Sequence, residues 1–177
     1  MPNYRRNLTP GGTFFFTVNL LDRRSDLLVT QIEALRTAVR QTHRRAPFQI
    51  DAWVVLPDHM HCLWTLPPGD TDYPARWRAI KTAFSKALPA SEQRSAVRVR
   101  RGERGIWQHR YWEHTIRDER DYTAHIDYTH FNPVKHGHVS HPAEWPHSSF
   151  RRCAAAGLYP IDWSDPEAAP AETGERQ

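Results

Sequence analysis

Four segments of the chain have the hydrophobic pattern and composition of β-strands. They are residues 13–20, 48–56, 59–66 and 106–112. The first is rich in aromatic and β-branched residues and follows Gly11-Gly12. Only Pro57-Asp58 separates the second from the third. Because two such turn residues leave room only for a tight reversal, we predict that these two strands pair antiparallel.

Apolar residues recur every three or four positions in other segments, which predicts helices. The first helix is expected from Thr30 to about residue 45, the second from Pro74 to Leu88, and the third from an Asp118 cap to Asn132. Pro133 is expected to end the third helix. The segment between the second helix and the fourth strand, residues 89–105, is polar and arginine-rich, which favours a flexible basic loop.

The predicted order, β-α-β-β-α-β, is that of a ferredoxin-like split βαβ sandwich. We therefore expect an α+β fold in which two helices cover one face of an antiparallel sheet. The third helix is then an extra C-terminal helix, and it carries Tyr128. We expect one domain over residues 1–163 and a disordered tail over 164–177, where Pro, Ala and Glu dominate without apolar spacing.

The composition narrows the functional classes. Of 177 residues, 24 are Lys or Arg and 20 are Asp or Glu, and the pI is near 9.3. This mild basicity permits phosphate binding without proving it. The two cysteines indicate no disulfide framework, and we expect no secretion signal and no membrane span. A bacterial cytoplasmic, nucleoid-associated location is the expectation.

His59 and His61 stand two residues apart on the third predicted strand. Successive side chains of a strand point to opposite faces, so both imidazoles emerge on one face while Met60 and Cys62 pack on the other. Two imidazoles on one rigid strand can share a divalent cation. Amidohydrolases also use a His-x-His pair, but their barrel needs about 200 residues or more, which this chain cannot supply.

Tyr128 and Asn132 are four residues apart and so share one helix face. The Asn132 amide oxygen could complete a Mg²⁺ or Mn²⁺ site with the two histidines. A cation on a phosphodiester would favour attack by the Tyr128 hydroxyl, giving a phosphotyrosine and a free sugar hydroxyl. His125 or Lys135 could move the proton. The simpler alternatives are that Tyr128 is a packed aromatic and that Asn132 merely ends the helix.

Several arginines are candidates for DNA contact. They are Arg5, Arg6, Arg98, Arg100, Arg101 and Arg104. Arginine-rich segments are more often solvated loops than nucleic-acid arms, so both interpretations stay open.

These motifs together resemble the REP-associated tyrosine transposases, relatives of the single-strand insertion-sequence transposases in the HUH endonuclease superfamily. The resemblance covers nearly the whole chain. Its carriers are Tyr4-Arg5-Arg6, Gly11-Gly12-Thr13, residues 15–20, residues 52–62, Trp107-Gln108, Trp112-Glu113-His114, Asp127-Tyr128 and residues 132–137.

The resemblance implies an HUH domain that binds single-stranded DNA folded into a hairpin, the repetitive extragenic palindrome (REP), and cuts beside it. Matched by position, His59 and His61 are the metal-binding pair, Asn132 the third ligand and Tyr128 the nucleophile that joins the 5′ phosphate. Insertion-sequence relatives often have Gln where this chain has Asn132, and both amides offer a carbonyl oxygen. The resemblance also favours a monomer.

Two other functions remain as alternatives. The chain could be a domesticated DNA- or RNA-hairpin-binding regulator that does not cut, or a metal-dependent phosphodiesterase that uses water as the nucleophile. The first would bind hairpins in EDTA without cleaving them in Mn²⁺. The second would leave no covalent protein–DNA adduct.

Overall fold

The computed structural model describes residues 6–92, 94–166, 170 and 172–175. The strands are β1 Thr13–Asn19, β2 Gln49–Val55, β3 His59–Thr65 and β4 Trp112–Thr115. The helices are α1 Leu27–Thr30, α2 Ile32–Arg45, α3 Tyr73–Ala87, α4 Ala96–Arg100, α5 Glu119–Lys135, the 3-10 helix η1 Pro142–Glu144 and α6 Phe150–Ala155.

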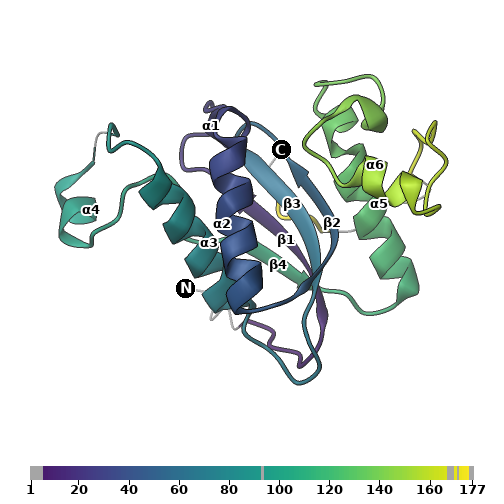
Figure 1. Ribbon diagram of the computed structural model, residues 1–177, viewed down its shortest axis with the longest axis horizontal. Coiled ribbons are helices and arrows are strands. Elements are labelled where there is room, and N and C mark those ends of the chain that lie inside the picture. Colours follow the sequence, from purple (N-terminus) through teal and green to yellow (C-terminus); the bar gives the residue numbers. More distant parts are fainter. Residues whose placement is uncertain (1–5, 93, 167–169, 171, 176–177) are drawn as a thin grey trace.

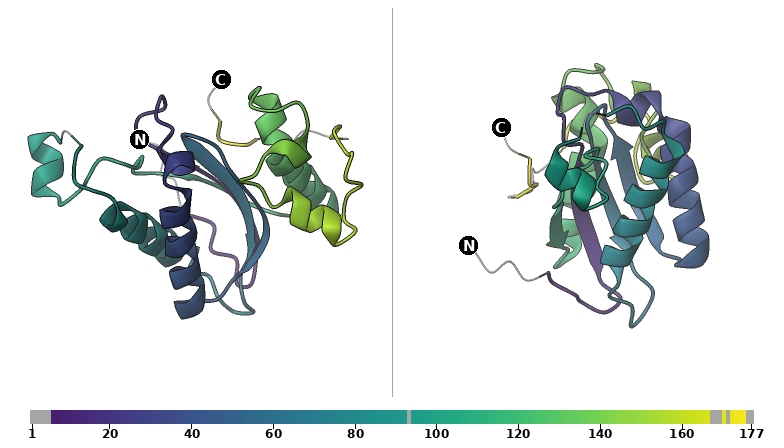
Figure 2. Two further views of the ribbon diagram at one scale, coloured as in Figure 1. Left: turned by 45° about the horizontal axis from the view of Figure 1, so that its top comes forward. Right: turned by 90° about the vertical axis from the view of Figure 1, so that its left-hand side faces the viewer.

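The four strands form one antiparallel sheet in the order β2-β3-β1-β4. Helices α2 and α3 cover one face, and α5 with α6 lies on the other (Figures 1 and 2). The predicted α+β fold, with two helices on one face and an extra helix bearing Tyr128, is confirmed. The short helix α4 projects away from the body of the molecule (Figure 1).

The alternation of side chains on β1 builds both halves of the core. Phe14, Phe16 and Val18 pack toward α2 and α3 in the larger apolar cluster. Phe15 belongs to the smaller cluster beneath α5. Because β1 and β3 are central strands covered on both faces, nearly all of their side chains are buried. The sheet is therefore a rigid base for the side chains that face α5.

The turn between β2 and β3 fixes where His59 and His61 lie. The main-chain N–H of Leu56 donates to the His59 carbonyl at 2.8 Å, which closes the turn at Pro57-Asp58. Met60 and Cys62 pack in the larger cluster, as predicted. The two histidines therefore face α5, on the opposite side of the sheet.

Three local predictions are wrong. The fourth strand is Trp112–Thr115 rather than residues 106–112, and residues 106–107 contribute only a bridge from Trp107 to Leu20. The segment 89–105 contains a short helix, α4, capped by Ser95. Helix α5 passes through Pro133 and ends at Lys135. Pro133 lacks the N–H for one helix hydrogen bond, and its burial within α5 offsets that loss.

Part of the C-terminal segment packs against the sheet. The predicted disorder of residues 164–177 stays a prediction, and the described residues 172–175 lie against the face of the sheet beneath α5. The Thr173 carbonyl accepts a hydrogen bond from the Thr17 hydroxyl at 2.5 Å. Along the described part of the chain, no helix combines the length and the apolar character needed to cross a bilayer.

Candidate metal and tyrosine site

Two buried imidazoles from β3 form the base of the site. The ring centroids of His59 and His61 are 5.1 Å apart, and both side chains are almost fully buried. The Nε2 atoms lie 3.4 Å (His59) and 2.6 Å (His61) from the same carboxylate oxygen, Oε1 of Glu175. The two rings therefore converge on one point, as the His-x-His spacing predicts.

Neighbouring side chains fix the tautomers of both rings. The Nδ1–H of His59 donates to Asp58 Oδ1 at 2.7 Å, and Arg23 holds the other oxygen of Asp58 at 2.6 Å. The Thr17 hydroxyl donates its hydrogen bond to the Thr173 carbonyl. Its oxygen therefore accepts a hydrogen bond from His61 Nδ1 at 2.8 Å. In the structure both Nε2 atoms face the Glu175 carboxylate. With each Nδ1 donating, an Nε2 released from Glu175 would offer its lone pair to a cation.

The helix α5 supplies the third element of the site. Asn132 is fully buried, and its Nδ2 donates to Glu175 Oε1 at 3.1 Å. Its amide oxygen, Oδ1, is buried and has no hydrogen-bond partner among the described residues. A buried amide oxygen without a donor is costly unless a cation or water completes it.

These donors fit a divalent cation. Burial lowers the pKa of His61 to about 4, so its ring is neutral and can ligate at neutral pH. Two imidazole nitrogens and an amide oxygen suit Mn²⁺ and also accept Mg²⁺. His59, His136 and Glu175 form a further group whose ligand atoms lie within 4.8 Å of one another. Burial opposes ionisation of Glu175, but hydrogen bonds from the three histidines around it hold its pKa well below the usual range.

Tyr128 lies beside this point on α5. Its ring centroid is 5.3 Å from that of His61 and 6.1 Å from that of Phe15. The Lys135 ammonium donates to the Tyr128 hydroxyl at 2.8 Å and also pairs with Glu175. Burial raises the pKa of Tyr128, and the hydrogen bond from Lys135 opposes that rise.

His125 makes other contacts. Its Nδ1–H donates to the Asp121 carbonyl at 2.8 Å, and its ring stacks on His114 with centroids 4.6 Å apart. His114 Nε2 in turn donates to the Asp121 carboxylate at 2.8 Å. Of the two proton-transfer candidates, the structure thus places Lys135 on the Tyr128 hydroxyl and His125 in a network with Asp121.

Comparison with known proteins identifies the family. The chain is 52% identical to the REP-associated tyrosine transposase of Escherichia coli K12 over 93% of this chain and 92% of that protein. The chain belongs to the REP-associated tyrosine transposases. A Haemophilus influenzae protein assigned provisionally to the same family is 46% identical over 92% of this chain and 93% of its own length. No family model matches the sequence.

A solved structure of a REP-associated tyrosine transposase bound to a REP hairpin has the same fold. It superposes with a TM-score of 0.87 at 50% identity, and the alignment covers 100% of this chain and 99% of that one. Members of this family are HUH endonucleases, so the chain is a transposase enzyme with the predicted fold.

The arginines predicted to contact DNA in this transposase differ in their surroundings. Arg5 lies outside the described residues. Arg6 stacks over the Tyr111 ring at 4.8 Å, and Arg98, Arg100 and Arg101 belong to the projecting segment around α4. The Arg104 guanidinium makes its hydrogen bonds within the protein and has no N–H group left for DNA. All five of its N–H groups bind Glu92 and the carbonyls of Ser85, Leu88 and Pro89.

Three contributors to the transposase site were not predicted. Asp58 was interpreted only as a turn residue, although a carboxylate next to a candidate metal-binding histidine is itself a signal. Thr17 is the one polar residue in the middle of an aromatic strand, which is a weaker signal. Glu175 lies in a segment whose composition predicts no contacts at all.

Proposed function

We propose that the chain is a metal-dependent single-strand DNA endonuclease and strand transferase that acts on REP hairpins through a 5′-phosphotyrosine intermediate. Membership of the family supports the reaction, and a relative bound to a REP hairpin supports the substrate. We also propose that the protein acts as a monomer in the bacterial cytoplasm.

One observation carries the assignment of residues. Lys135 bonds both the Tyr128 hydroxyl and the Glu175 carboxylate, and that carboxylate lies against both imidazoles. The phenol oxygen and the cation site therefore adjoin a single oxyanion position. A scissile phosphate is an oxyanion of the same kind, and the donors that hold Glu175 could hold it.

His59, His61 and Asn132 would hold a Mn²⁺ or Mg²⁺ ion, which offsets charge on the phosphate oxygens during an in-line displacement. In the proposed step the Tyr128 oxygen forms a bond to phosphorus and the bond to the 3′ oxygen of the neighbouring sugar breaks. The charged Lys135 ammonium cannot take the phenol proton. It instead stabilises the phenolate. The phenol proton passes to water, and the leaving 3′ oxygen takes up a proton from water to become a hydroxyl.

The reverse reaction uses the same groups. The phosphotyrosine and the original phosphodiester are esters of similar energy, so a 3′ hydroxyl can attack the phosphotyrosine and rejoin the strand without ATP. This favours strand transfer over simple hydrolysis.

The test uses a 5′ or 3′ labelled REP-type hairpin oligonucleotide incubated with the protein and Mn²⁺, followed by a denaturing gel. The wild-type protein should give a covalent adduct, and Tyr128→Phe should give neither adduct nor cut strand. Tyr122 lies on the same helix, but its hydroxyl donates to Asp51 at 3.1 Å, so Tyr122→Phe is the matched control and should behave as wild type. Cleavage by Tyr128→Phe at the wild-type rate would show that water is the nucleophile, and hairpin binding in EDTA with no cleavage in Mn²⁺ would favour the regulator.

A further inference from the structure

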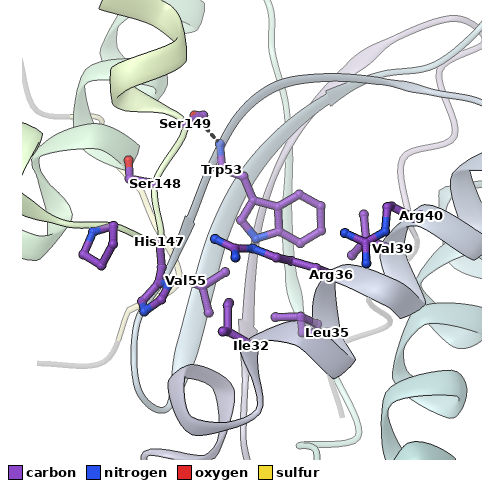
Figure 3. Close-up of a pocket in the computed structure, with 11 residues that line it drawn as sticks. Ile32, Leu35, Arg36, Val39, Arg40, Trp53, Val55, His147, Ser148 and Ser149 are labelled. Carbon is purple, nitrogen blue, oxygen red and sulfur yellow. Dashed lines mark hydrogen bonds between the residues drawn. The ribbon is translucent and has the colours of Figure 1, made fainter.

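A cavity of about 260 Å³ lies between α2 and the edge strand β2, on the sheet face opposite the metal site. Figure 3 shows the Trp53 indole facing side chains of α2, with Val55 beside it. The lining is completed by Ile32, Leu35, Arg36, Val39, Arg40 and residues 146–149. The cavity is smaller than the ~300–1,000 Å³ of sites for drug-sized ligands, so it suits a single flat ring system.

The wall of this cavity is held in place by the chain that follows α5. The Ser149 main chain and hydroxyl both bond the Trp53 backbone at 2.8 Å, and Val55 N–H donates to the His147 carbonyl at 2.8 Å. These bonds cover the open edge of β2. They fix the backbone from which the Trp53 indole and the His147 ring line the pocket.

Two polar atoms of the lining are buried without partners. The indole Nε1–H of Trp53 and the Nδ1 of His147 have no hydrogen-bond partner in the described portion of the protein. Burial and the nearby Arg36 charge lower the pKa of His147, so the ring is neutral at pH 7 and can donate or accept. Both atoms lie beneath the surface that a water-sized probe reaches, so a base in the cavity would bond them only after the Trp53 or His147 ring turns toward it.

The rim of the cavity is cationic. Arg36 and Arg40 stand one turn apart on α2. Arg36 binds Glu33 at 2.6 Å through one nitrogen, and its side chain remains 46% exposed. Arg40 binds only the Thr37 hydroxyl among the residues described, at 3.0 Å. Both guanidinium groups therefore retain donors for an anion such as a phosphate.

A row of rings leads from the metal site to this cavity around the edge of the sheet. The row comprises His59, His136, His138, Trp145 and His147. Successive ring centroids are 5.1, 6.3, 5.1 and 5.6 Å apart. The Trp145 indole donates to the Val55 carbonyl at 2.9 Å, which fixes the row on β2. Aromatic rings in series beside cationic groups are typical of surfaces that bind unpaired bases.

Acidic groups along the row are already paired. The Asp58 carboxylate binds Arg23 and His59, and Glu144 accepts from the main-chain N–H groups of Ser140 and His141. The Glu175 carboxylate lies between His59 and His136 and pairs with Lys135, so a polyanion would have to displace it at the metal-site end of the row.

From these features we infer that the cavity binds one unpaired nucleobase of the substrate strand. Its phosphate would lie on Arg36 and Arg40, and the strand would follow the row of rings from the metal site. The inference rests on the proposed function, because a single-stranded DNA substrate supplies the occupant. It adds a second DNA-binding site on the face opposite the tyrosine.

The test measures binding in EDTA, where no cleavage occurs, by fluorescence anisotropy. A REP-type hairpin carries a single-stranded extension that is lengthened one nucleotide at a time on either its 5′ or its 3′ side. The affinity of the wild-type protein should rise about tenfold at one length, when a base reaches the cavity. An abasic nucleotide at that position should abolish the gain.

Two variants test the cavity itself. Val39→Trp fills the cavity with an apolar ring, and the double change Arg36→Gln with Arg40→Gln removes the rim charges without touching the core. Both should bind the unextended hairpin as wild type does and should lose the tenfold gain. Arg44→Gln, on the same helix but outside the lining, is the matched control and should keep the gain.

Three results would overturn the inference: no gain at any extension length, a gain that survives Val39→Trp, or a gain that an abasic nucleotide retains. The last would show that only phosphates are bound. Adduct formation in Mn²⁺ is measured separately on the unextended hairpin. A failed proposed function would remove the adduct, and a failed inference would leave the adduct while the gain is absent.

Discussion

At the scale of single residues, the site depends on groups that orient the metal-binding histidines. The Asp58 carboxylate accepts a hydrogen bond from His59 Nδ1–H and forms an ion pair with Arg23. A carboxylate in this position fixes the ring and increases the basicity of the Nε2 atom. The neighbouring residue in sequence therefore decides whether His59 can act as a ligand.

We predict that Asp58→Asn weakens Mn²⁺ binding by about 10- to 100-fold, the usual cost of losing such a carboxylate. Isothermal titration with Mn²⁺ in the absence of DNA measures this directly. Asp22→Asn is the matched control, because Asp22 is an exposed carboxylate that bonds only Arg24 among the residues described. Equal Mn²⁺ affinities of Asp58→Asn and wild type would show that Asp58 serves only the turn.

Lys135 should stabilise the phenolate form of the nucleophile, Tyr128, through its hydrogen bond to the hydroxyl. Removing its ammonium leaves the phenolate without a hydrogen bond from a charged group, which is worth about 1.5–3 kcal/mol. Adduct formation by Lys135→Ala should therefore slow by about one to two orders of magnitude. The rise of its rate with pH should also move to higher pH, because the Tyr128 pKa rises when the opposing cation is lost.

Single-turnover gels across a pH series measure both effects. Lys135→Arg keeps a cation within reach of Tyr128 and should recover much of the rate. A Lys135→Ala enzyme that is slower by the same factor at every pH would argue that Lys135 binds the phosphate and leaves the phenol unaffected.

At the scale of elements, the continuation of α5 beyond Pro133 matters for the site. Lys135 lies two turns after Tyr128, and only an unbroken helix brings its ammonium back to the phenol. Beyond the helix, Gly137 adopts a φ of 71°, which lets its N–H bond the Val134 carbonyl. The sequence rule that proline ends a helix fails here because Pro133 is buried in a packed helix.

Arg104 holds together the projecting segment, residues 89–105, around α4. Its guanidinium binds the Ser85 carbonyl near the end of α3, the Leu88 and Pro89 carbonyls just beyond it, and the Glu92 carboxylate, so it joins the two ends of the segment. We predict that Arg104→Ala increases the rate of limited proteolysis within residues 89–105. Arg104→Lys should not restore resistance, because one ammonium cannot reach all of these acceptors.

Arg101→Ala, an exposed arginine of the same segment, is the control and should digest as wild type does. Unchanged digestion of Arg104→Ala would mean that the packing of α4 alone holds the segment. Hairpin binding measured on the same variants would separate this structural role from any contact of Arg98, Arg100 and Arg101 with DNA.

At the scale of the whole molecule, burial of neutral histidines couples stability to pH. Burial lowers the pKa of His61 to about 4 and that of His130 to about 3. In the unfolded chain both should titrate near ~6.5. Between these values the unfolded chain binds more protons, so the free energy of unfolding falls as pH is lowered below about 6.5.

We predict that His130→Gln makes this fall shallower by up to about 1.4 kcal/mol per pH unit, since one depressed group is removed. Urea unfolding in EDTA at pH 7, 6 and 5 measures the slope. His109→Gln, at an exposed position, should leave the slope unchanged. An unaltered slope for His130→Gln would mean that His130 binds protons equally in the folded and unfolded chains, so that burial does not lower its pKa.

The sequence by itself determined the parts of this protein that rest on local periodicity. Alternation on β1 and β3 fixed which residues face each layer, and the spacings of His59 with His61 and of Tyr128 with Asn132 fixed which side chains share a face. These relations follow from the two-residue repeat of a strand and the 3.6-residue repeat of a helix. They hold whatever the rest of the chain does, so the fold class followed from the sequence.

Only the tertiary structure decided which groups complete those pairs. The Thr17 contact with His61 depends on the register of β1 against β3, and the Lys135 contact with Tyr128 depends on a helix that packing extends past a proline. The cavity beside Trp53 requires a segment almost a hundred residues later to cover the β2 edge. Such contacts join residues far apart in the chain, and no local pattern records them because their energy exists only once the layers have packed.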